Sequence, residues 1–184
     1  MKRTLSPSPV SYPVNVSHLA RSGLPVWLEA DDKQRQALAD DHDLASVESF
    51  RFDLKLAPWK GDGVRITGNV RAAITQTCVV TLEPLKADID EIVDAILVPE
   101  GSNLANPDWA GHGELVIEAD GPDMPETFSG DSVDVGALAE EFFVLAIDPY
   151  PRKEGASLPE VGAGETGEAR GPLYEKLQGL VRRT

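Results

Sequence analysis

The chain has 184 residues with a formal net charge of −14, and 41% of its residues are hydrophobic. This length and composition support one substantial domain with a core and exclude a generally disordered chain. A single cysteine cannot form an internal disulfide, so nothing indicates an oxidising compartment. The N-terminus lacks the apolar core of a secretory signal, and the longest apolar run, FFVLAI, is far too short to span a bilayer. We therefore expect a cytoplasmic protein.

The acidic charge is concentrated in the middle of the sequence. Residues 1–86 carry 11 Lys and Arg against 10 Asp and Glu, whereas residues 87–151 carry 16 Asp and Glu and no Lys or Arg. This acidic block would repel a phosphate backbone and attract a cationic partner over about 8–10 Å at physiological salt. The block also has a simpler interpretation, namely an acidic surface that keeps the protein soluble.

The N-terminal part of the chain predicts two short strands and a helix. Alternating apolar residues predict strands on either side of a Gly-Leu-Pro turn. These residues are Val14, Val16, Val26 and Leu28. The segment DDKQRQALADDH predicts a helix at about residues 32–41, because Asp31 and Asp32 supply the negative charge that a helix N-terminus favours.

The next part of the chain predicts long β-strands. In VESFRFDLKLAP, large apolar residues alternate with charged ones, which is the pattern of a strand with one buried face. The apolar set is Phe50, Phe52, Leu54 and Leu56. GDG at 61–63 predicts a turn, and VRITGNVRAAITQTCVV predicts a second long strand that ends before Pro84. ADIDEIVDAILVP then alternates weakly through Ile89, Ile92 and Ile96, so three consecutive strands predict an antiparallel meander.

The segment after this meander predicts a loop and an amphipathic helix. Residues 99–131 contain four prolines and predict a loop, with a short strand at ELVIEA. DSVDVGALAEEFFVLAIDPYPRK places apolar residues at helical spacing, with Asp131 or Asp134 as the N-cap and Pro149 at the end. The apolar stripe consists of Val135, Leu138, Ala139, Phe142, Phe143 and Leu145.

Together these elements predict an α+β fold. We expect an antiparallel β-sheet or partly open barrel of about five to seven strands, with two or three helices packed on it. Residues 1–153 would form the single domain. The composition of residues 154–172, rich in Gly, Ala and Glu, predicts a flexible linker, and residues 173–184 predict a short C-terminal helix.

No catalytic or metal-binding arrangement is visible in the sequence. Cys78 lies among apolar residues of the second long strand with no histidine near it in sequence, which favours a buried side chain over a nucleophile. One cysteine and three scattered histidines, His18, His42 and His112, do not make a zinc site, and no EF-hand pattern appears. Phosphate-binding glycine motifs and the G-x-S-x-G elbow are absent too. The sequence thus indicates no metal, no cofactor and no catalytic residue.

Two stretches resemble a known family. QTCVVTLEPLKADIDE, followed further along by VDVGALAEEFFVLAIDPYPRK, is similar to the YceD family, the large ribosomal RNA subunit accumulation proteins of bacteria and plastids, and looks closest to its alphaproteobacterial branch. The signature positions are Gln76, Cys78, Leu82, Pro84, Asp134, Leu138, Leu145 and Pro149. Many members carry Cys-x-Arg-Cys-Leu where this chain has Val80 and Thr81 in place of the arginine and the second cysteine. The resemblance therefore implies no metal or redox role for a cysteine pair in this chain.

The resemblance implies a role in large-subunit ribosome biogenesis. We expect a non-enzymatic factor that contacts a basic ribosomal protein or assembly factor, because an acidic protein is poorly suited to clamp RNA. The candidate partner surface is the polar side of the helix and its Pro-rich exit: Glu140, Glu141, Asp148, Tyr150, Pro151 and Arg152. Two alternatives stay open. One is a direct binder of ribosomal RNA that uses the basic residues of the first 86 positions with Arg182 and Arg183, and the other is a carboxylate- and metal-dependent hydrolase.

Overall fold

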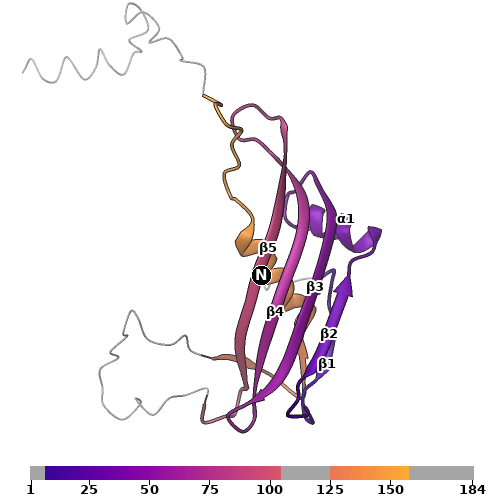
Figure 1. Cartoon of the computed structure of the whole chain (residues 1–184), viewed down its shortest axis with the longest axis vertical. Coiled ribbons are helices and arrows are strands. Elements are labelled where there is room, and N and C mark those ends of the chain that lie inside the picture. The colour runs from indigo at the N-terminus through magenta and orange to yellow at the C-terminus, as the bar shows by residue number, and fades with distance from the viewer. Residues whose placement is uncertain (1–6, 105–124, 158–184) are drawn as a thin grey trace, which may run out of the picture.

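The structure, a computed structural model of the chain, describes residues 7–104 and 125–157 (Figure 1). The strands are β1 (Pro13–Asn15), β2 (Leu24–Glu29), β3 (Ser46–Trp59), β4 (Gly63–Thr77), β5 (Pro84–Pro99), β6 (Glu126–Phe128) and β7 (Ser132–Asp134), and the helices are α1 (Asp32–Asp41) and α2 (Val135–Ala146). The main sheet has the order β2-β3-β4-β5-β6, and β1 pairs with β7 in a second sheet. The α+β prediction is confirmed, and the main sheet is open rather than a closed barrel. In the described part of the chain, no helix is long and apolar enough to cross a membrane.

Strands β3, β4 and β5 form the antiparallel meander that the sequence predicts. The apolar residues of β3 that the alternation places on one face are all buried: Phe50, Phe52, Leu54 and Leu56. The charged residues between them are exposed, as expected for a strand with one solvated face. The last strand, β6, pairs in parallel with residues 97–99 of β5, so the sheet is mixed and not purely antiparallel.

The N-terminal elements form close to where the sequence predicts them, but their pairing differs. Helix α1 has the predicted bounds, and Asp31 and Gln34 cap its N-terminus with reciprocal hydrogen bonds. β1 pairs with β7 and not with β2. The prediction of a turn at Gly-Leu-Pro is wrong, because Leu24 and Pro25 belong to β2 and the turn before this strand ends at Gly23. Proline is tolerated there because β2 is the edge strand of the main sheet.

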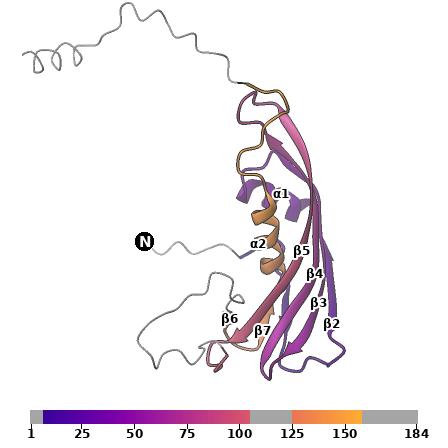
Figure 2. The ribbon, with the colours of Figure 1, turned by 60° about the vertical axis from the view of Figure 1, so that its left-hand side comes forward.

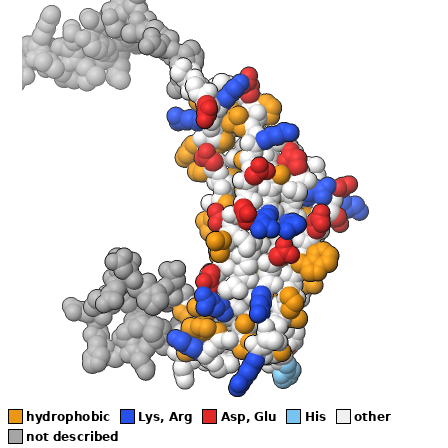
Figure 3. Space-filling model, in the orientation of Figure 1, with side chains coloured by type: hydrophobic (Ala, Val, Ile, Leu, Met, Phe, Trp, Pro, Cys, Tyr) orange, Lys and Arg blue, Asp and Glu red, His pale blue; other side chains and the backbone are white. Residues whose placement is uncertain are grey.

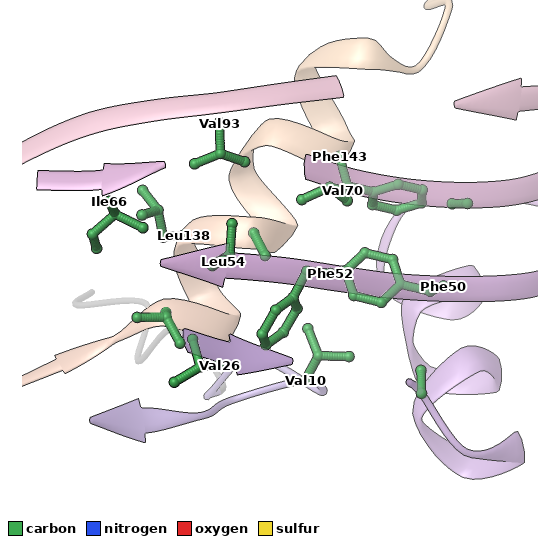
Figure 4. Close-up of a cluster of buried hydrophobic side chains, with 14 of the residues drawn as sticks. Val10, Val26, Phe50, Phe52, Leu54, Ile66, Val70, Val93, Leu138 and Phe143 are labelled. Atoms are coloured by element: carbon green, nitrogen blue, oxygen red, sulfur yellow. The ribbon is translucent and has the colours of Figure 1, made fainter. Parts of the chain in front are cut away.

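Both helices pack on the same face of the main sheet, which we call the inner face (Figure 2). The core lies between them and the sheet, where Phe143 of α2 meets Phe50 edge-to-face at a centroid distance of 5.3 Å (Figure 4). Close approach of α2 to the N-terminal segment depends on Gly136, since a Cβ there would collide with the carbonyl oxygen of Val10. Asp134 caps α2 as predicted, accepting the N–H groups of Gly136 and Ala137.

No helix of the described residues covers the opposite face of the main sheet, the outer face (Figure 2). Acidic and basic side chains are interspersed over it (Figure 3). Two cross-strand ion pairs lie on it, Arg65 with Asp94 at 2.7 Å and Arg71 with Asp90 at 3.2 Å. Ile92 belongs to this face and is 72% exposed. The weak alternation through Ile89, Ile92 and Ile96 therefore does not mark one face of β5, because Ile89 is buried and residues three apart on a strand point to opposite faces.

Three predictions fall wholly or largely outside the described residues. These are the strand at ELVIEA, most of the linker at 154–172, and the C-terminal helix at 173–184. The division of the chain at residue 153 accordingly stays a prediction.

Candidate functional site

The two stretches that carry the family resemblance meet at one end of the main sheet (Figure 1). The first stretch includes the turn between β4 and β5, and the second includes α2 and the segment that follows it. The N–H of Val79 donates to the carbonyl oxygen of Pro151 at 2.9 Å. We call residues 76–84 together with 147–153 the signature junction.

Side chains reinforce this backbone contact on both sides. The Gln76 amide donates to the carbonyl oxygen of Asp148 at 2.8 Å, and Gln76 itself is buried. The Lys153 ammonium pairs with the Glu83 carboxylate at 2.7 Å on the exposed side. The ion pair adds little because both groups are solvated, whereas the buried amide would lose its partner if the second stretch moved away.

The β4–β5 turn is a short loop closed by its own backbone. The N–H of Cys78 donates to the carbonyl oxygen of Glu83 at 2.9 Å, and the N–H of Leu82 donates to that of Cys78 at 3.0 Å. Leu82 has a φ of 60°, in the left-handed region that costs a non-glycine residue about 1–2 kcal/mol. β4 ends at Thr77, so the prediction that Cys78 lies within the strand is wrong. The turn residues are themselves apolar and β-branched, and they extend the alternating pattern past the true end of the strand.

The sulfur of Cys78 joins the two halves of the signature junction. The side chain is fully buried, as predicted, and its Sγ accepts the N–H groups of Thr81 and Lys153, both at 3.4 Å. Hydrogen bonds from Thr81, and a further one from Lys153, lower the pKa of the Cys78 thiol to about 6, although burial acts in the opposite direction. A thiol enclosed in this way has no open side from which to attack a substrate, so its role in this structure is to hold the two stretches together.

Large apolar side chains are exposed on the signature junction and on the last turn of α2. Leu82 is 75% exposed, Tyr150 71% and Leu145 83%. Leu145 was predicted to belong to the buried stripe of the helix, and this prediction is wrong. In the last turn of α2, the buried side of the helix runs through Phe143 to the partly buried Ala146 instead. Leu82 and Tyr150 both belong to the signature junction, and exposed apolar groups that form a continuous patch are typical of protein–protein contact sites.

Glu140 is not free for a partner, in contrast to the sequence-based expectation. Its side chain is 13% exposed, and its Oε1 accepts a hydrogen bond from Nε2 of His42 at 2.7 Å. Burial raises the pKa of Glu140, but hydrogen bonds from His42 and Ser8 outweigh it and hold this pKa below its ordinary value. No local pattern in the sequence indicates this pair, because its members lie 98 positions apart.

The other predicted partner residues stay accessible. Glu141, Asp148, Tyr150 and Arg152 are exposed, and Pro151 is partly buried under its contact with Val79. All of these residues except Glu141 lie on the signature junction or next to its contacts. Sequence reasoning missed Leu82 and Val79 as surface residues because they look like the interior of a strand.

The geometry of the signature junction suits binding better than bond-making chemistry. Within residues 7–104 and 125–157, no three His, Cys, Asp or Glu side chains come close enough together to hold a metal ion. The metal-dependent hydrolase alternative therefore has no support in that part of the chain. A hollow of about 460 Å³ lies at the opposite end of the sheet, beside the β3–β4 turn, lined in part by His18, Asp62 and Asp131.

Fold and site define an open-sheet α+β protein in which two distant stretches build one exposed surface around a buried thiol. The chain belongs to the YceD family: residues 66–176 match the family described as "Large ribosomal RNA subunit accumulation protein YceD". The match begins in β4 and includes both halves of the signature junction. Comparison with curated proteins gave no match, and comparison with solved structures gave none either. The alphaproteobacterial branch stays a prediction.

Proposed function

We propose that this chain is a non-enzymatic ribosome biogenesis factor that acts in the cytoplasm through contacts with basic ribosomal proteins or assembly factors. The family description names accumulation of the large ribosomal RNA subunit, and the contact surface is our addition. The observation that carries the proposal is the signature junction, in which the two family stretches come together and leave Leu82 and Tyr150 exposed. The net charge of −14 favours cationic partners.

A pull-down of the tagged full-length chain from a lysate of its native host tests this proposal. The expected result is enrichment of ribosomal proteins or large-subunit precursor particles that survives nuclease treatment. Absence of any ribosomal component from the eluate would overturn the proposal. Enrichment that nuclease abolishes would instead favour contact through RNA.

Leu82 allows the surface to be altered without loss of the fold. Leu82→Asn removes the exposed apolar group, and asparagine tolerates the left-handed backbone better than leucine, so stability should be kept or slightly raised. We expect Leu82→Asn to weaken partner capture by about ten-fold if Leu82 is a central contact. Trp27→Ser is the matched control, because Trp27 is an exposed apolar residue of the outer face, away from the signature junction. Equal capture by both variants would contradict the assignment of the surface.

Direct RNA binding is the second candidate function. Three of the 11 basic residues in positions 1–86 are arginines of the outer face, and each is already paired with a carboxylate: Arg51 with Asp53, Arg65 with Asp94 and Arg71 with Asp90. A phosphate would have to displace these partners, which weakens the electrostatic term on which RNA affinity depends. Measurement of RNA binding against salt concentration decides between the two functions, since a direct RNA binder requires a steep salt dependence.

A further inference from the structure

One edge of the main sheet carries a long stretch of backbone without a partner strand. β5 pairs with β4 along its length, but on its other side β6 covers only residues 97–99. In the described part of the chain, no strand pairs with residues 84–96 on that side (Figure 1). Such an edge presents N–H and C=O groups to which an extended peptide can pair as an added strand.

The backbone groups of the even-numbered residues of β5 point toward this free side. Just beyond the ladder, the N–H of Cys78 donates to the carbonyl oxygen of Glu83, and these two positions continue the register of the ladder. Hydrogen-bonded and non-bonded pairs alternate along an antiparallel ladder, and the register between β4 and β5 is continuous. Pro84, which lacks an N–H, is therefore turned away from β4, and the N–H of Ile92 points to the free side as well.

The free side of β5 is acidic. Asp88 and Glu91 of β5, Glu126 of β6 and Glu141 of α2 make no ion pair with any described residue. Helix α2, which carries Glu141, packs against β5, and β5 pairs with β6. Burial and repulsion from Glu126 of β6 raise the pKa of Glu141. Lys86 lies at the start of β5 on the same face as Asp88, and the sequence from 87 to 151 adds no further Lys or Arg.

This charge decides which kind of strand the edge accepts. Glu91 occupies an inner-face position between Ile89 and Val93, and a charge in such a position guards an edge against uncontrolled pairing. A second copy of this acidic chain would bring like charges together, whereas a cationic strand would neutralise them. The β2 edge at the other end of the sheet is shorter and contains Pro25, so it offers no comparable stretch.

We propose that the free edge of β5 binds an extended, lysine- and arginine-rich segment of a partner protein as an added strand. The inference rests on the proposed function, because it specifies how a basic partner is held. Backbone hydrogen bonds to residues 86–96 supply the affinity. Cationic side chains at alternate positions reach Glu91 and Glu141 on the inner side and Asp88 on the outer side.

The test uses the full-length chain and a capped synthetic dodecapeptide of alternating lysine and threonine. The expected result is saturable binding, with new hydrogen-exchange protection of the amides of the even-numbered residues of β5. Ile92→Pro removes an outward N–H without touching the ladder to β4, and we expect it to weaken binding by about ten-fold or more. The matched variant Ile92→Ala keeps the N–H and should bind within about two-fold of the wild type.

A second probe separates strand addition from simple charge attraction. The same peptide, N-methylated at alternate residues, keeps every positive charge but cannot complete the ladder, so it should bind at least about ten-fold more weakly. If circular dichroism shows that the Ile92→Pro variant is not folded, the comparison of the two peptides on the wild-type protein still tests the inference.

Several results would overturn the inference. Equal binding of the two peptides would show an electrostatic contact without strand addition. Protection of the even-numbered β5 amides before peptide is added would show that another part of the chain covers the edge. A dimer that dissociates in the Ile92→Pro variant would identify a second copy of the chain as the occupant of the edge.

Failure of this inference can be distinguished from failure of the proposed function. If the peptide fails to bind while the wild-type and Ile92→Pro proteins capture the same ribosomal proteins, the inference about the edge is refuted and the proposed function stands. If the peptide binds but nothing ribosomal is captured, the proposed function falls, and with it the partner that the inference assumes.

Discussion

The inner and outer faces of the main sheet are built from alternate residues of the same strands, yet different forces hold them. On β3, Phe50 and Phe52 point inward and are fully buried beneath the helices. Arg51 and Asp53 point outward and form an exposed ion pair at 3.3 Å. Fully burying an aromatic side chain contributes about 1.5–3 kcal/mol, whereas an exposed ion pair contributes about 0.2–1 kcal/mol.

This difference separates stability from recognition within one sheet. The inner face and the helices carry most of the free energy of folding, so changes there should act through unfolding. The outer face, the free edge of β5 and the exposed side chains of the signature junction carry little of it, so changes to these groups should alter binding while the fold persists. The four predictions below test this division, from the largest expected effect to the smallest.

Replacing Phe143 by alanine should have the largest effect on stability. Phe143 is fully buried and packs edge-to-face against Phe50, so Phe143→Ala should lower the free energy of unfolding by about 3–5 kcal/mol. Trp27→Ala, which truncates a large but exposed residue on the outer face, should change it by less than about 0.5 kcal/mol. Urea unfolding of the two variants provides the comparison, and similar losses would refute the division between the faces.

Cys78→Ala tests whether the burial of a side chain also determines the loss of stability at a position outside the sheet. The thiol is fully buried in the signature junction, so we expect a loss of about 1–3 kcal/mol with partner capture retained. Cys78→Ser keeps an acceptor for the N–H groups of Thr81 and Lys153 and serves as the matched variant. A folded Cys78→Ala protein that captures nothing would show that the sulfur has a chemical role that its burial does not suggest.

Glu140→Gln should lower the free energy of unfolding by about 1–2 kcal/mol near neutral pH, because it weakens a charged hydrogen bond from His42. The folded-state pKa of Glu140 lies below its ordinary value of 4.5, so the folded protein binds fewer protons than the unfolded chain near that pH. The stabilisation from Glu140 is thus complete above about pH 5 and is lost as the pH falls through and below 4.5. Urea unfolding across this range should give a shallower loss for Glu140→Gln than for the wild type, and identical slopes would refute the assignment.

The smallest effect is expected from the ion pair between Arg65 and Asp94 on the outer face. Its geometry is bidentate, but both side chains are about half exposed, so a double-mutant cycle with Arg65→Met and Asp94→Asn should give a coupling energy of about 0.2–1 kcal/mol. The coupling should shrink further at high salt. A coupling above about 2 kcal/mol would mean that the outer face is shielded from solvent by another part of the chain or by a partner.

Elements with a local signal were predicted well from the sequence. The start of α1 was predicted from the negative charge of Asp31 and Asp32, and the buried face of β3 follows from a strict period of two. The stripe of α2 was right as far as Phe143, and its N-cap at Asp134 was right as well. Errors arose where neighbouring residues give conflicting signals, as at Ile92, or where a turn is built from strand-like residues, as after Thr77.

The sequence by itself determined the α+β class, the meander, the acidic block and the family, because periodicity, charge and signature residues are all properties of short stretches. Only the tertiary structure decided that β1 pairs with β7, that His42 binds Glu140, and that the sulfur of Cys78 meets the N–H of Lys153. It also decided that residues 84–96 of β5, which pair with β4 on one side, are left without a partner strand of the described chain on the other. Each of these features depends on which distant segments come together, and that choice is set by the packing of the whole core rather than by any local pattern.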